Sequence, residues 1–220
     1  MNPEILVAVK TSPNLPSMPS VAMRVVEMAQ SEEVDVNELA DLIATDPALT
    51  TKILKTVNSP FYGLSKEVAT ISQALVVLGL QAVKTLVLGF SLVRDLKSQE
   101  ENDSGFDYDT YWRRSIYAAV AARQIGQEVN LAEHEEAFLA ALLQDVGMPA
   151  LHATLGERYD QVLEQDGPSH QTLPDAEQSA IDATHAEVTS LLASTWQLPT
   201  ILSNPITFHH NPDAAPEESQ

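Results

Sequence analysis

The stretch DPALTTKILKTVNSPFYG, residues 46–63, carries both ends of a short helix and the loop that follows it. Asp46 and Pro47 indicate the start, because an aspartate side chain caps free backbone N–H groups and a proline fits the first helical turn. Apolar residues then recur at four-residue steps on one helical face, at Leu49, Ile53 and Val57. The run Asn58-Ser59-Pro60 ends the pattern. A helix is therefore expected between Asp46 and Asn58.

Helical signals extend over nearly the whole chain outside this stretch. Helix starts are indicated at Pro19, at Asp35 with Glu38, at Thr70 with Gln73 and at Thr184 with Glu187. Gly79 is expected to close the helix that Thr70 opens. A longer helix is expected from Gln81 to about Lys97, and another through HEEAFLAALLQDVG to about Gly147. No strand or hairpin pattern is present, so the sequence predicts an all-α protein.

The polar segment SQEENDSG, residues 98–105, is the expected boundary between two helical layers. The first layer would comprise residues 1–98 and the second residues 99–212. A Pro-rich acidic tail, residues 213–220, is expected to be loose. Hydrophobic residues make up 44% of the chain, which is enough for a substantial core.

Charge and cysteine content exclude several classes of protein. The formal net charge is −19, and Arg158 is the only base after residue 123, so nucleic acid and anionic membrane surfaces are not expected partners. The absence of cysteine excludes a disulfide scaffold, a thiol nucleophile and a Cys-based zinc site, and it fits a reducing cytoplasm. No run reaches about 18 uninterrupted apolar residues, so no transmembrane helix is expected. A cytoplasmic location is the resulting expectation.

Six stretches, taken together, point to a family. They are DPALTTKIL, VNSPFYG and TISQALVVLGLQAVK in the first half, and YWRRSIYAAVAA, AFLAALLQDVGMPAL and HAEVTSLLASTWQLPTILSNPITFHHNP in the second. In order and spacing over residues 14–212 they resemble the HDOD domain, a helical bacterial signalling module related to the HD phosphohydrolases. The resemblance implies a multi-helix orthogonal bundle of the HDOD/HD-like type and a regulatory role in signal transduction.

The resemblance also identifies the positions at which active HD enzymes bind metal ions. The histidine of an early helix corresponds to Arg114, and the adjacent His-Asp pair corresponds to Gln144 and Asp145. His185 and the pair His209-His210 resemble positions of the HD-GYP branch, which cleaves cyclic dinucleotides, although Asn-Pro follows the pair in place of the GYP signature. An arginine cannot ligate a metal, and a glutamine is a poor neutral ligand.

These substitutions predict a degenerate site with no metal, cofactor or catalytic residue. Arg114 would form a salt bridge with Asp145 in the metal's place, and Gln144 would hydrogen-bond within the same pocket. Two alternatives stay open. One is a metal-dependent phosphodiesterase or phosphohydrolase with a reduced ligand set. The other is a sensor that binds a nucleotide or anion without turnover.

The histidines also have structural interpretations. His185 would lie in the first turn of its helix. His209 and His210 would end a helix, where positive charge is favourable. Adjacent helical residues point about 100° apart, so the two are not expected to face one pocket. No role is assigned to the histidines of expected surface or turn regions, which are His134, His152 and His170.

The loop VNSPFYG offers a candidate contact surface. Phe61 and Tyr62 lie between Asn58 and Gly63, and exposed aromatic residues on a loop suit a protein contact. The alternative is that they pack as a plug over the helical core. With the resemblance, this loop favours a non-catalytic module that acts through protein–protein contacts with signalling proteins, such as receiver or cyclic-dinucleotide-related domains. The sequence leaves the oligomeric state open.

Overall fold

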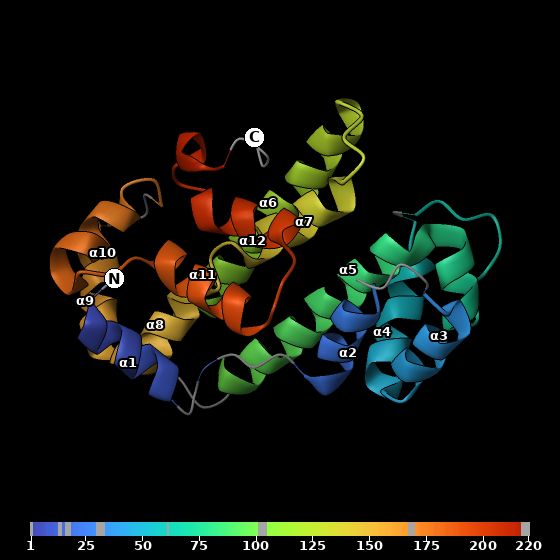
Figure 1. Cartoon of the computed structure of the whole chain (residues 1–220), viewed down its shortest axis with the longest axis horizontal. Coiled ribbons are helices and arrows are strands. Elements are labelled where there is room, and N and C mark those ends of the chain that lie inside the picture. The colour runs from blue at the N-terminus through green and yellow to red at the C-terminus, as the bar shows by residue number, and fades with distance from the viewer. Residues whose placement is uncertain are drawn as a thin grey trace. The chain divides into compact units, whose positions relative to one another are not determined.

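The computed structural model describes residues 2–12, 15, 19–29, 34–60, 62–100, 105–166 and 170–216 of the 220-residue chain. All regular structure in these ranges is helical, without a β-strand, and the all-α prediction is confirmed (Figure 1). The chain forms two compact units. The small unit is Ser17–Asp95, and the large unit combines Met1–Pro16 with Leu96–Gln220.

The small unit contains α2 (Ser20–Ala29), α3 (Val36–Ala44), α4 (Pro47–Val57) and most of α5 (Ile71–Glu100). The predicted caps are present. Asp35 accepts from the Asn37 N–H at 2.8 Å, and Asp46 accepts from the Leu49 N–H at 3.0 Å. Asp46 also pairs with Arg94 of α5, with 2.6 Å between Oδ2 and Nη1. The predicted apolar face of α4 is buried, at Leu49, Ile53 and Val57.

Helix α5 is broken once, at Gly79, where φ is 84° and ψ is 167°. Only glycine adopts such a conformation readily, so the expected closure at this residue is confirmed. The start is capped as predicted, because Thr70 Oγ1 accepts from the Gln73 N–H at 3.2 Å. The helix continues to Glu100, beyond the predicted end and into the polar segment.

The candidate contact loop is fixed to its own helix by Asn58. The Asn58 side chain donates to the carbonyls of Leu54, at 2.9 Å, and Val68, at 2.8 Å. Its Oδ1 accepts from the Val68 N–H at 2.8 Å. Gly63 has a φ of 61°, which favours glycine, and Tyr62 is half-buried. Phe61 lies outside the described residues. Asn58 thus has a clear structural role in shaping this loop.

The large unit contains the remaining helices. They are α1 (Pro3–Thr11), α6 (Tyr108–Glu128), α7 (His134–Leu143), α8 (Gly147–Leu155), α9 (Glu157–Asp166), α10 (Leu173–Ile181), α11 (His185–Thr195), α12 (Thr200–Phe208) and the 3-10 turn η1 (Pro212–Ala214). Helices α6 and α7 pack side by side, α12 packs on α7 and α11, and α11 packs on α8 (Figure 1). This arrangement brings the ends of α7, α10 and α12 close to the start of α11.

The N-terminal residues pack in the large unit, whereas the sequence placed them in the first layer. The Asn2 N–H donates to the Asp182 carbonyl at 2.7 Å, and α1 packs on α8. Ile5 and Val9 are buried there. An amphipathic helix must bury its apolar face, but its sequence does not say against which element. The unit boundary at residues 95 and 96 lies close to the expected one at 98 and 99.

The C-terminal end and the α7 region also differ from the prediction. The start of the expected loose tail forms η1, and residues 217–220 lie outside the described part. The helix expected through HEEAFLAALLQDVG ends at Leu143, a turn covers residues 144–146, and α8 starts at Gly147. This turn carries Asp145.

Two described stretches, Ile71–Ser91 and His134–Leu155, are apolar and long enough by composition to cross a membrane. Of their most apolar windows, 56% and 67% are buried inside the protein. Core helices of globular proteins meet the same criterion, so this is weak evidence for a membrane span.

Candidate metal centre

Asp145 lies in the turn between α7 and α8 and is fully buried. The start of α8 packs closely on the start of α11. The Gly147 N–H donates to Thr189 Oγ1 at 2.8 Å, and the Thr189 hydroxyl donates to the His185 carbonyl at 2.8 Å. A Cβ at Gly147 would lie 2.0 Å from that carbonyl oxygen, so only glycine fits. This close approach brings Asp145 to His185.

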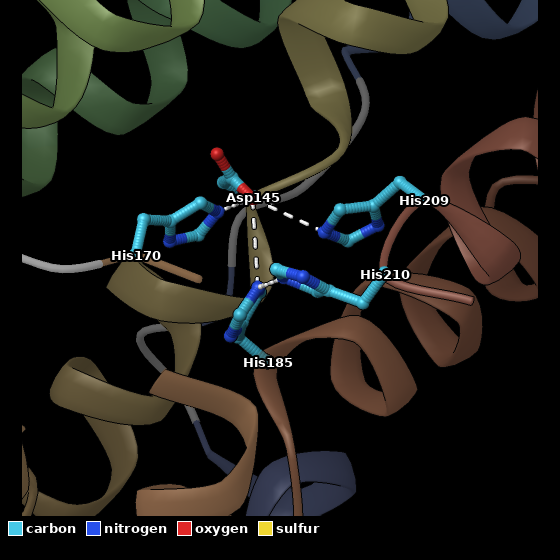
Figure 2. Close-up of side chains that lie close together, drawn as sticks. All are labelled: Asp145, His170, His185, His209 and His210. Atoms are coloured by element: carbon cyan, nitrogen blue, oxygen red, sulfur yellow. Dashed lines mark hydrogen bonds and ion pairs between the residues drawn. The ribbon is translucent and has the colours of Figure 1, made fainter. Parts of the chain in front are cut away.

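Four histidines converge on the Asp145 carboxylate (Figure 2). Three Nε2 atoms lie near its Oδ1, at 3.1 Å for His170, 3.4 Å for His209 and 3.5 Å for His185. His210 Nε2 lies 2.9 Å from His185 Nε2. One ligand-type atom from each residue lies within 4.8 Å of all the others. Asp145, His170, His185, His209 and His210 are called the His/Asp cluster below.

His185 is oriented by Glu177, which is fully buried on α10. Glu177 Oε2 accepts from the His185 backbone N–H and from its ring Nδ1, both at 2.8 Å. Because a carboxylate only accepts, Nδ1 carries a proton and Nε2 faces the cluster. Tyr159 donates to Glu177 Oε1 at 2.5 Å, and burial together with this carboxylate raises the pKa of Tyr159 well above its usual value. A carboxylate behind a ligating histidine is a common partner in metal sites.

His209 and His210 both join the cluster, so the expectation that they diverge was wrong. Helix α12 ends at Phe208, and the two residues form the turn that follows. The helical spacing of about 100° per residue therefore no longer applies. The Nδ1 of His209 lies 2.7 Å from the Ile206 carbonyl, to which it donates, so its Nε2 faces Asp145.

His170, to which the sequence assigned no role, is a member of the cluster. It lies in the turn before α10 and belongs to no motif, so no sequence signal pointed to it. His152 was expected in a surface or turn region but is buried in α8, where its Nδ1 lies 2.7 Å from Asp160 Oδ1. His134 starts α7 and lies outside the cluster.

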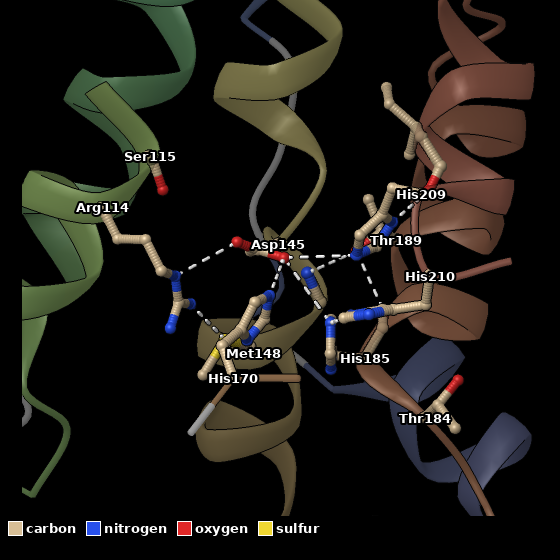
Figure 3. A network of polar contacts seen from close by, with 12 residues as sticks. Arg114, Ser115, Asp145, Met148, His170, Thr184, His185, Thr189, His209 and His210 are labelled. Atoms are coloured by element: carbon tan, nitrogen blue, oxygen red, sulfur yellow. Dashed lines mark hydrogen bonds and ion pairs between the residues drawn. The ribbon is translucent and has the colours of Figure 1, made fainter. Parts of the chain in front are cut away.

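Arg114 of α6 contacts the other oxygen of the same carboxylate. Its Nε lies 3.4 Å from Asp145 Oδ2, the ion pair that the sequence predicts, and its Nη2 donates to Met148 Sδ at 2.8 Å. Figure 3 shows the guanidinium next to Oδ2 of Asp145, and the imidazoles of three histidines near Oδ1. Gln144 lines a cavity of about 580 Å³ together with His209 and residues of α7 and α12.

The charges of the cluster depend on one another. Burial alone would raise the pKa of Asp145, but contacts with His170, His185 and His209 hold it well below the usual value. Burial also lowers the pKa of His185, but Asp145 and Glu177 outweigh it and raise that pKa to about 9. Burial and the neighbouring histidines lower the pKa of His210 to about 3. Asp145 is thus a stable anion surrounded by nitrogen donors.

The donor set fits one metal ion better than two. Four imidazoles and one carboxylate are ligands that transition-metal ions accept. A second ion on the Oδ2 side of Asp145 would meet the Arg114 guanidinium, which is permanently charged and has no lone pair to offer. The HD-type pair of metals is therefore not supported by these residues, whereas a single ion among the histidines is.

Comparisons with known proteins agree with the fold and the resemblance. The sequence matches the HDOD domain family over residues 15–212. A solved HDOD domain protein of Geobacter sulfurreducens is 25% identical with a TM-score of 0.81, over 97% of this chain and 72% of that one. A solved Shewanella amazonensis protein, provisionally named a phosphohydrolase, is 24% identical with a TM-score of 0.77, over 97% of this chain and 74% of that one.

A Treponema pallidum protein is 28% identical over 207 residues. These are 93% of this chain but 39% of that protein, so the chain spans less than half the length of this relative. The Shewanella likeness shows the fold alone. The family match covers most of the chain, and this chain belongs to the HDOD domain family.

Proposed function

We propose that this chain is a cytoplasmic bacterial signal-transduction module that acts through contacts with other signalling proteins and does not hydrolyse phosphodiesters. Its partners would be proteins with receiver or cyclic-dinucleotide-related domains. The proposal rests on the HDOD membership and on one observation in the site. Arg114 lies against Oδ2 of Asp145, whereas the histidines approach Oδ1.

This contact argues against the two-metal mechanism of phosphodiester cleavage. In that mechanism a pair of metal ions about 3.5–4 Å apart stabilises the attacking and leaving oxygens, and an open coordination position holds the attacking water. Asp145 Oδ2 is engaged by a guanidinium, and the neighbouring Gln144 replaces the histidine that would hold an ion there. The site thus lacks the ligands for the second ion.

An exposed apolar face on α6 supports the part of the proposal that concerns protein contacts. Ile116, Tyr117 and Val120 share one side of this helix by their spacing and are 48%, 69% and 37% exposed. Exposed apolar side chains that cluster on one face are typical of interaction surfaces. This face gives the protein a candidate contact surface whose three apolar residues all lie within the described part of the chain, whereas Phe61 of the loop does not.

The activity part is tested with purified protein after incubation with manganese, iron or nickel. Cyclic dinucleotides and bis(p-nitrophenyl) phosphate serve as substrates, and Asp145→Ala is the matched control. We expect the same background rate for the wild type and this variant. Turnover by the wild type that Asp145→Ala abolishes would contradict the proposal and favour a phosphodiesterase with a reduced ligand set.

The contact part is tested by calorimetric titration with receiver domains of the same bacterium, with and without beryllofluoride to mimic phosphorylation. Cyclic-dinucleotide-related domains are titrated in the same way. We expect at least one partner to bind, and Tyr117→Glu to weaken this binding while Glu164→Gln, on exposed α9 surface, leaves it unchanged. Absence of binding to every such domain would overturn this part.

A further inference from the structure

The convergence within the His/Asp cluster is not explained by hydrogen bonds. Three imidazole nitrogens face a single oxygen, Asp145 Oδ1, but a carboxylate oxygen has only two lone pairs. Within the described residues, both Asp145 oxygens, both ring nitrogens of His170 and Nε2 of His209 are buried without a hydrogen-bond partner. Buried polar groups without a partner are rare, and each calls for an explanation such as a bound ion.

The spacing of the donor atoms matches the surroundings of one metal ion. With ligand bonds of about 2.1 Å, adjacent ligand atoms lie about 3.0–3.4 Å apart around a single octahedral or tetrahedral ion. Adjacent atoms of the cluster are 3.1, 3.4 and 3.5 Å from Asp145 Oδ1, and the two Nε2 atoms of His185 and His210 are 2.9 Å apart. If these groups were hydrogen-bonded to one another without a metal ion, most of the contacts would be too long or poorly angled for a hydrogen bond.

Two of the histidines are held in the orientation that a metal ligand needs. His185 Nδ1 is engaged by Glu177, and His209 Nδ1 is engaged by the Ile206 carbonyl. Each Nδ1 therefore carries a proton, and each Nε2 is directed inward. Backbone carbonyls and carboxylates in these positions fix the tautomer and the ring plane of ligating histidines.

We infer that the His/Asp cluster binds a single transition-metal ion and that His170 is one of its ligands. Imidazole-rich sites suit zinc, nickel, cobalt and ferrous iron, whereas magnesium and calcium prefer oxygen ligands. Arg114 neutralises the remaining Asp145 oxygen, which limits the site to one ion. The inference does not depend on the proposed function, since an ion can bind whether or not the chain hydrolyses anything.

The position of His170 suits an ion with a structural role rather than a catalytic one. His170 lies in the turn before α10, whereas the other ligands lie in or next to α8, α11 and α12. Its side chain is 20% exposed, against 10% for His209 and none for Asp145 and His185, so among these it is the ligand nearest to solvent. A bound ion would join this turn to α8, α11 and the end of α12. The ion would thus stabilise the large unit and close the site on its exposed side.

The inference is tested by metal analysis of protein purified without a histidine tag. Elemental analysis follows incubation with zinc, nickel or cobalt and removal of excess metal, and cobalt titration is followed by visible absorption. We expect about one ion per chain, and an affinity at least about tenfold weaker for His170→Ala. His134→Ala, a histidine outside the cluster, is the matched control and is expected to bind like the wild type.

The thermal midpoint gives a second readout, because a ligand that binds only the folded state stabilises it. Metal is expected to raise the midpoint of the wild type and of His134→Ala, and to raise that of His170→Ala less. Circular dichroism establishes that each variant folds. No bound metal in the wild type, two ions per chain, or unchanged affinity in His170→Ala would each overturn the inference. Hydrolysis by metal-bound protein would instead overturn only the proposed function.

Discussion

Arg114 Nε lies 3.4 Å from Oδ2 of Asp145, whereas the histidines approach the other oxygen of the same carboxylate, Oδ1 (Figure 3). The buried anion is therefore compensated from two directions, by a permanent charge and by imidazoles. This division explains why the site keeps Asp145 ionised without requiring two metal ions. The contributions of the guanidinium and of the imidazoles can be measured separately, because each can be removed by a different substitution.

Arg114→Ala removes the permanent charge and leaves Oδ2 buried beside no cation. We expect the free energy of unfolding of the metal-free protein to fall by about 1–3 kcal/mol, less than for a fully buried pair because water screens part of the interaction. The Arg114 side chain is 31% exposed. Urea unfolding measures this change. Arg113→Ala, at the exposed neighbouring residue, is expected to change the free energy of unfolding by less than about 0.5 kcal/mol. Equal changes in the two variants would mean that the ion pair between Arg114 and Asp145 does not stabilise the protein.

Glu177→Gln tests the group that orients His185. Glu177 accepts from the Tyr159 hydroxyl and from two N–H groups of His185, and a glutamine offers only one acceptor oxygen for them. We expect cobalt affinity to fall by about 10- to 100-fold. The unfolding free energy should fall by about 1–3 kcal/mol, because a buried donor loses its acceptor. Glu164→Gln on α9 is the exposed control. Unchanged cobalt affinity would show that Glu177 does not position a metal ligand.

Much of the fold was predictable because it depends on local chemistry. The caps at Asp35 and Asp46 follow from side chains that reach N–H groups two or three residues away. The break at Gly79 follows from a backbone conformation that other residues avoid. The ion pair between Arg114 and Asp145 was predictable because aligned positions and opposite charges both pointed to it.

The composition of the cluster was not predictable to the same extent. His170 stands in a turn without a repeating pattern, and only the packing around α10 brings it to Asp145. For His209 and His210 the result depends on the residue at which α12 ends, and sequence patterns locate helix ends less reliably than helix interiors. The same uncertainty put Asp145 in a helix, although it lies in a turn.

Gly147→Ala tests the close approach between α8 and α11. The added Cβ would lie 2.0 Å from the His185 carbonyl oxygen, and a backbone atom cannot move aside without shifting the helix. We expect the unfolding free energy to fall by about 3 kcal/mol, at the upper end of overpacking effects. Gly63→Ala meets no atom within 4 Å and has a φ of 61°, so strain alone predicts a loss of about 1–2 kcal/mol. Comparable losses in the two variants would show that α8 can move away from His185.

Asp46 gives a pH-dependent prediction for the small unit. The Leu49 N–H and, after an opposing effect of burial, Arg94 hold the pKa of Asp46 below its usual value of 3.8. Because this pKa is lower in the folded than in the unfolded state, the charge stabilises the protein above about pH 4, and the effect is lost as pH falls through the folded pKa.

Asp46→Asn keeps a capping side chain but removes the charge. It should lower the unfolding free energy at pH 7 by about 0.5–1 kcal/mol and make no difference below the folded pKa. Asp46→Ala should lose about 1 kcal/mol more at pH 7, because the cap is lost as well. Urea unfolding of the three proteins from pH 2 to pH 7 measures this, and a constant gap between wild type and Asp46→Asn would show that the charge has no role.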